Sequence, residues 1–155
     1  MLNNNFKKII LCIGTSKCVG DSLGPIIGEI LNKKVNDSNI YIFGNIKNNI
    51  TYQNIDFVFE KIEKQVKNPY YIVIDSALSS KENIGKIIIT RQNMVIGSSL
   101  NKTNYKLGDL CMKGIVGENK FNNINNYNEL NNVKFNLITK LSIKISNKII
   151  DLINV

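Results

Sequence analysis

The stretch IGTSKCVGDSLGPIIGEIL, residues 13–31, decides the fold. Just before it, residues 7–13 become continuously apolar after two lysines, which predicts a strand buried on both faces, as in a parallel sheet. After Gly14, a short loop leads to a predicted helix over 22–31, where apolar residues recur at helical spacing. Asp21 lies between these two elements. The stretch therefore predicts a strand–loop–helix unit with a carboxylate in its loop.

The rest of the chain alternates strand and helix patterns before it changes to consecutive strands. We predict strands over 40–43, 70–74, 84–90 and 109–116 and helices over 55–66 and 133–153. Residues 92–105 and 117–132 are predicted to be polar loops, the second with room for one helical turn. The alternation in the first half implies a mostly parallel sheet with helices on both faces. The length of 155 residues fits a single α/β domain over 1–155.

The composition excludes several classes of site, because the chain contains no histidine. A Ser-His-Asp triad, a Cys-His pair and a histidine metal site cannot be built from this chain alone. Three cysteines without paired spacing indicate reduced thiols and a cytoplasmic protein. The N-terminal residues do not resemble a signal peptide, and no apolar run is long enough to cross a membrane. We therefore expect no membrane partner.

The net charge of +8 permits an acidic partner. However, the lysines are scattered, and Arg91 is the only arginine, although specific base recognition depends heavily on arginine. The sequence therefore argues against nucleic acid as the main partner.

Two aspartates are the candidate catalytic residues. Asp21 follows the first strand, and Asp75 ends the predicted strand over 70–74. Ligands of open parallel sheets bind beyond the carboxyl ends of the strands, so a strand order of 2-1-3 would place both aspartates beside one crevice. Two close carboxylates share a proton, and the pair can then activate water and protonate a leaving group. Each aspartate taken singly is more simply explained as a helix or turn cap.

Four further residues are candidate substrate contacts. Ser22 and Ser76 each follow one of the aspartates, and Gly44 and Asn45 follow the second predicted strand at the same edge of the sheet. A capping role for Ser22 and a plain turn at Gly44 and Asn45 are the alternatives.

Two familiar motifs within residues 13–31 are rejected. The GDSL word over 20–23 would make Ser22 the nucleophile of an esterase, but that mechanism needs a histidine base. The glycines at 14 and 20 suggest a phosphate loop, but Asp21 occupies the lysine position of that motif and would repel phosphate.

Four segments carry a family resemblance: VGDSLGPIIG, IFGN, YIVIDSAL and LGDLCMKGIV. In order and spacing they resemble the YyaC-type sporulation proteins, often called spore proteases, up to about residue 116. These proteins look like relatives of the germination protease of spore formers and, more distantly, of hydrogenase maturation peptidases. VGDSLGP is the most specific segment.

The resemblance implies a three-layer α/β sandwich of the phosphorylase/hydrolase-like fold. It also implies an aspartic-type peptidase without a cofactor or metal, because the catalytic aspartates of the germination protease family fall on Asp21 and Asp75. The implied setting is the cytoplasm of a sporulating cell or forespore, and the implied substrates are proteins or peptides, by analogy small acid-soluble spore proteins. Hydrogenase maturation peptidases hold nickel with acidic residues and a histidine, which is absent here. A non-catalytic sporulation module for binding or regulation on the same fold is the alternative.

Overall fold

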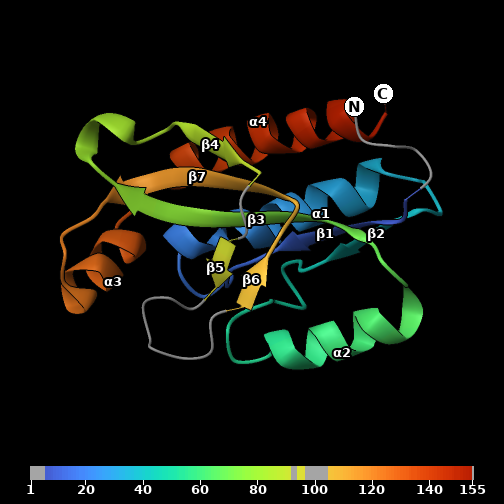
Figure 1. The fold of residues 1–155 in the computed structure, drawn as a ribbon. Helices are drawn as coiled ribbons and strands as arrows, with labels where there is room; N and C mark the ends of the chain where they lie inside the picture. The colour runs from blue at the N-terminus through green and yellow to red at the C-terminus, as the bar shows by residue number, and fades with distance from the viewer. Residues whose placement is uncertain (1–5, 92–93, 97–104, 155) are drawn as a thin grey trace.

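The computed structural model describes residues 6–91, 94–96 and 105–154, and its centre is a five-stranded sheet (Figure 1). The strand order is β2-β1-β3-β7-β4, in which the first four strands are parallel and β4 runs antiparallel to β7. The prediction of a mostly parallel sheet is confirmed, and the first three strands have the 2-1-3 order that a shared crevice for the two aspartates requires. The strands of this sheet are β1 (Lys8–Cys12), β2 (Ile40–Phe43), β3 (Tyr70–Ser79), β4 (Ile87–Thr90) and β7 (Leu110–Glu118).

Helices cover both faces of the sheet, which gives the expected three layers (Figure 1). Helices α1 (Leu23–Lys34) and α4 (Phe135–Ile153) pack together on one face, and α2 (Ile55–Gln65) covers the other. No helix in the described part of the chain is long and apolar enough to cross a membrane.

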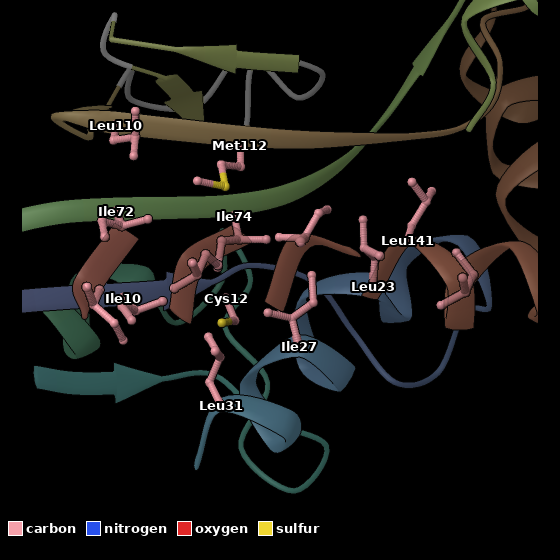
Figure 2. Packing of buried hydrophobic residues seen from close by; sticks show 14 of the residues in the cluster. Ile10, Cys12, Leu23, Ile27, Leu31, Ile72, Ile74, Leu110, Met112 and Leu141 are labelled. Atoms are coloured by element: carbon pink, nitrogen blue, oxygen red, sulfur yellow. The ribbon is translucent and has the colours of Figure 1, made fainter. Parts of the chain in front are cut away.

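Alternate residues of the central strands pack on opposite faces of the sheet, as strand geometry requires. Ile10, Ile72 and Ile74 are fully buried against the layer of α1 and α4 (Figure 2), whereas Ile9 and Val73 are buried on the side of α2. Because both faces are covered, the central strands need apolar residues at every position, which explains their continuous apolar pattern.

The segments predicted as loops contain short elements. Within 92–105 the structure has β5 (Met94–Ile96), which pairs with β6 (Tyr105–Leu107), while residues 92–93 and 97–104 lie outside the described part. Within 117–132 it has a full helix, α3 (Asn123–Asn131). The loop prediction failed at α3 because asparagine is a poor helix former. Here the side chain of Asn122 caps the helix by accepting hydrogen bonds from the backbone of Ile124 and Asn125.

Strand β3 is longer than predicted. It pairs with β7 from Ile72 to Ser79, whereas its pairing with β1 stops at Ile74. Asp75 therefore lies inside a strand and does not end it. The additional residues of β3 pair with β7, and the local sequence does not show that these two strands are neighbours.

Two glycines bring α1 directly onto the backbone at the carboxyl ends of β1 and β2. A Cβ atom at Gly24 would lie 2.0 Å from the carbonyl oxygen of Ile13, and one at Gly28 would lie 1.8 Å from that of Gly44. Only glycine fits at these contacts. The glycines of the stretch 13–31 therefore position the start of α1 and the turn that carries Asp21.

Candidate active site

One serine links the two predicted catalytic residues. Asp21 lies in a short 3-10 turn, η1 (Gly20–Ser22), at the start of α1. The hydroxyl of Ser76 donates a hydrogen bond of 2.9 Å to Oδ1 of Asp21, and the backbone N–H of Ser76 donates one of 2.8 Å to Oδ1 of Asp75. The structure therefore brings Asp21, Asp75 and Ser76 together, as the strand order predicted.

The alternation of side chains along β3 explains this link. Asp75 lies on the same face as Val73, toward α2, and Ser76 lies on the same face as Ile74, toward α1. Because η1 begins the α1 layer, the Ser76 hydroxyl reaches Asp21, while the backbone of the same residue contacts the Asp75 carboxyl group.

Neither aspartate acts as a cap. Asp21 makes no capping hydrogen bond at the start of η1 or α1, and Asp75 lies in the middle of β3. The structural explanations for the two aspartates taken singly therefore do not hold, and their carboxyl groups face an open pocket instead.

Burial raises the pKa values of both carboxyl groups. The pKa of Asp75 is raised to about 8, mainly by burial and secondly by the negative charge of Asp21. The positive charge of Lys113 and the hydrogen bond from the Ser76 N–H oppose this rise. Burial also raises the pKa of Asp21, against the effect of its hydrogen bond from Ser76. Near neutral pH the pair therefore retains a proton, which belongs to the pair as a whole.

Lys113 is a site residue to which the sequence assigned no role. It lies in β7 directly opposite Asp75 in the register of the two parallel strands, so the two side chains share one face of the sheet. Its positive charge stabilises the ionised form of Asp75. The one sequence signal was a single lysine within an otherwise apolar strand, next to the buried Met112.

The two carboxyl groups and Ser76 lie in a pocket with a volume of about 570 Å³. Its wall mixes polar with apolar side chains. Its other lining residues are Ile13, Gly14, Thr15, Lys17, Asn49, Thr51, Tyr52, Gln53, Asn54 and Leu130. A smaller pocket of about 310 Å³ lies at the first residues of β3 and β7, Tyr70 and Leu110, away from both aspartates.

Ser22 does not line the pocket. It is buried, and its hydroxyl donates a hydrogen bond of 2.6 Å to the carbonyl oxygen of Val19. The alternative of a capping side chain is also wrong, because Ser22 has helical backbone angles and accepts no hydrogen bond from α1.

Gly44 and Asn45 also lie outside the pocket, and the structure does not bring them to the carboxyl groups. Gly44 packs beneath α1, and Asn45 forms a turn in which its Oδ1 accepts hydrogen bonds from the backbone of Lys47 and Asn48. Asn49, later in this loop, lines the pocket instead and accepts hydrogen bonds from the Thr15 hydroxyl and the Ser16 N–H. The sequence predicted the correct loop but the wrong residues.

The donor atoms do not fit a nickel site of the histidine-containing kind. The described residues contain no group of three or more histidine, cysteine, aspartate or glutamate side chains that could hold a metal ion. The candidate site offers two carboxyl groups, one of which is already bonded to a serine hydroxyl, while the positive charge of Lys113 acts on the other. A nearby ammonium group disfavours a bound cation, and nickel prefers imidazole ligands.

Two solved structures share this fold closely. The NiFe hydrogenase maturation protease HycI from Thermococcus kodakarensis KOD1 matches with a TM-score of 0.64 and 14% identity, over 97% of this chain and 94% of its own. The hydrogenase maturating endopeptidase HybD from E. coli matches with a TM-score of 0.61 and 11% identity, over 96% of this chain and 92% of its own. At such low sequence identity, these structural matches establish the phosphorylase/hydrolase-like fold and no more.

Sequence comparison gives a nearer relative. The uncharacterized protein YyaC of Bacillus subtilis (strain 168) is 29% identical over 134 residues, which cover 86% of this chain but 63% of YyaC, so the chain spans less than two thirds of that relative's length. A family model described as "Protein of unknown function (DUF1256)" matches residues 1–148. The chain therefore belongs to the DUF1256 family.

Proposed function

We propose that this chain is a peptidase in which Asp21 and Asp75 activate water for attack on a peptide bond. The observation that carries the proposal is the double hydrogen bonding of Ser76, which holds both carboxyl groups at one open pocket. The raised pKa values of both groups support it, because one proton on such a pair supplies an acid and a base at the same pH.

The two carboxyl groups would have different roles. The Ser76 hydroxyl stabilises the ionised form of Asp21, so Asp21 acts as the base that removes a proton from water as its oxygen attacks the carbonyl carbon. Asp75 retains its proton because of burial, and donates it to the amide nitrogen as the C–N bond breaks. The charge of Lys113 then stabilises the carboxylate that Asp75 becomes.

The biological setting is part of the proposal. The VGDSLGP and IVIDSAL segments, and the similarity to YyaC, support a sporulation protein of the cytoplasm or forespore. The substrates would be proteins or peptides, small acid-soluble spore proteins among them. The fold shared with hydrogenase maturation proteases supports a peptidase, and the absence of histidine supports an aspartic-type mechanism without nickel.

The test compares three isosteric variants on a quenched-fluorescence peptide library, with cleavage sites identified by mass spectrometry. Asp21→Asn and Asp75→Asn should each lower the cleavage rate by at least about a hundredfold, the scale of losing an acid or base. Asp37→Asn, at an exposed turn residue, should leave the rate unchanged. EDTA should not reduce the wild-type rate. Full activity in both active-site variants would exclude the carboxylate mechanism.

A non-catalytic binding module on the same fold is the second candidate. The observation that favours it is that each carboxyl group already accepts a hydrogen bond from Ser76. In that case the wild-type chain would bind peptides in the pocket, Asp75→Asn would change only affinity, and no cleavage product would appear.

A further inference from the structure

A row of large apolar side chains on and just before α3 is exposed to solvent. Phe121 is 91% exposed, Ile124 73% and Tyr127 63%, and they follow one another at intervals of three residues. None of the residues of α3 is buried, so this helix contributes little to the core. We call Phe121, Ile124 and Tyr127 the α3 surface. Exposing three such side chains together is costly unless something covers them.

The segment that presents the α3 surface is firmly held. The N–H groups of Lys120 and Phe121 donate hydrogen bonds of 2.7 and 2.8 Å to the side chains of Asn126 and Asn119, and Asn122 caps the helix. Phe121 has a left-handed backbone with φ of 55°, which is unfavourable for a bulky residue. The fold therefore fixes the backbone that carries this exposed aromatic ring, which reduces the entropy cost of ordering the segment on binding.

The helix that carries the α3 surface also reaches the pocket. One further step of three residues along the helix leads from Tyr127 to Leu130, which lines the pocket. Leu130 rests on the turn that carries Asp21, since a Cβ atom at Gly20 would lie 2.8 Å from both Cδ2 and the carbonyl oxygen of Leu130. In Figure 1, α3 lies at the end of the molecule to which β3 and β7 point.

Charge contributes little at this surface. Glu129 is the only charged residue in α3, and its carboxyl group accepts a hydrogen bond from the backbone of Glu118. The neighbouring Lys120 forms an ion pair with Glu118. Apolar contact is therefore the main chemistry that Phe121, Ile124 and Tyr127 offer for recognition, beside the amide groups of the asparagines in α3.

We propose that the α3 surface docks an apolar segment of the polypeptide whose neighbouring peptide bond enters the pocket of Asp21 and Asp75. This inference rests on the proposed function, since it names the substrate class of the same site. Helix α3 has 9 residues and is therefore about 14 Å long, a distance that about four extended residues cover. Tyr127 lies three residues from Leu130 and Phe121 nine, so the substrate is an unfolded chain with apolar or aromatic residues within several positions of the bond that is cut.

The test uses Asp75→Asn, so that binding is measured without cleavage. The probe is fluorescently labelled, reduced and carboxymethylated α-lactalbumin, a permanently unfolded chain, and affinity is read from fluorescence anisotropy. Phe121→Asn, Ile124→Gln and Tyr127→Gln are combined, because asparagine tolerates the left-handed backbone and glutamine keeps the helix. The control combines Phe57→Gln and Ile143→Gln, on α2 and α4, where the side chains are 70% and 49% exposed.

The α3 triple variant should weaken binding at least tenfold, while the control pair changes it less than twofold. Both should retain the circular dichroism spectrum of the parent, because the substituted side chains are exposed. Equal binding by the triple variant, or no binding by the parent, overturns the inference. The inference is also overturned if the triple variant binds the probe normally but loses a dimer that light scattering detects in the parent. Normal probe binding together with a loss of binding to phosphatidylglycerol vesicles would overturn it as well.

Cleavage separates this inference from the proposed function. If the wild-type chain binds the probe through the α3 surface but never cuts it, the inference stands and the peptidase proposal fails. If Asp75-dependent cleavage of the probe keeps the same kcat/KM in the triple variant, the peptidase proposal stands and the inference fails.

Discussion

The raised pKa of Asp75 predicts that its replacement by asparagine stabilises the protein while abolishing the proposed peptidase activity. A carboxyl group whose pKa rises on folding binds a proton more tightly in the folded state. Its contribution to stability is therefore complete below the unfolded pKa and is lost as the pH rises toward the folded pKa. For Asp75 this interval runs from 3.8 to about 8.

The size of the effect follows from that interval. At pH 7 the protein lies about three units above the unfolded pKa of 3.8, and each unit is equivalent to about 1.4 kcal/mol. The wild-type chain should therefore lose at most about 4 kcal/mol between pH 4 and pH 7 through this group. Asp75→Asn has no such loss, because its amide is neutral at both values. One kcal/mol corresponds to about 2–4 °C in Tm at this chain length, so the variant should melt up to about 16 °C above the wild type at pH 7.

The assay is thermal unfolding by circular dichroism between pH 4 and pH 8. The difference in Tm between Asp75→Asn and wild type should be smallest at pH 4 and should grow steadily toward pH 8. Asp37→Asn is the matched control and should follow the wild type throughout, since Asp37 is exposed. Parallel Tm curves for Asp75→Asn and wild type would refute the reasoning, because they would mean that Asp75 titrates with an ordinary pKa.

Three further predictions concern other parts of the molecule. Ser76→Ala removes the hydrogen bond from the serine hydroxyl to Asp21, so the pKa of Asp21 should rise further. The acidic limb of the pH–rate profile for peptide cleavage should then move to higher pH. An unchanged profile would show that the hydroxyl has no catalytic role. Ser146 is fully buried and its hydroxyl has no hydrogen-bond partner in the described part of the chain, so Ser146→Ala should raise the free energy of unfolding by about 1 kcal/mol in urea titrations. A loss of stability would instead mean that the hydroxyl is satisfied. Gly28→Ala would place a Cβ atom 1.8 Å from the Gly44 carbonyl oxygen, so it should cost at least about 3 kcal/mol or prevent folding, and a near-wild-type Tm would contradict the close contact.

The convergence of the two aspartates could be predicted from sequence because it depends on rules that are nearly local. Apolar runs followed by helical patterns identify parallel strands, and the strand order then places the end of β1 beside β3. This was sufficient to bring Asp21 and Asp75 to one site. The long C-terminal helix was predictable for a similar reason, since its apolar stripe is regular over 19 residues.

The residues that complete the site depend on information that is not local. Lys113 faces Asp75 only through the register of β3 and β7, which are separated by a segment that includes β4, β5 and β6. Ser76 reaches Asp21 only because β3 continues past Asp75, and that continuation is created by pairing with β7. Gly44 and Asn45 were assigned to the pocket because they follow β2, but the loop turns away there and returns at Asn49.

The close contact of α1 with the strand ends has a consequence for how this chain could acquire new substrates. Gly24 and Gly28 touch backbone carbonyl groups directly, so no adjustable side chain lies between the helix and the main chain at these two contacts. The distance from Asp21 to β3 is accordingly fixed by the main chain, and few substitutions there are tolerated. Helix α3 meets the same turn through Leu130 and buries none of its own residues. Selection could therefore redesign α3 for a different target while the chemistry beneath it stays constant.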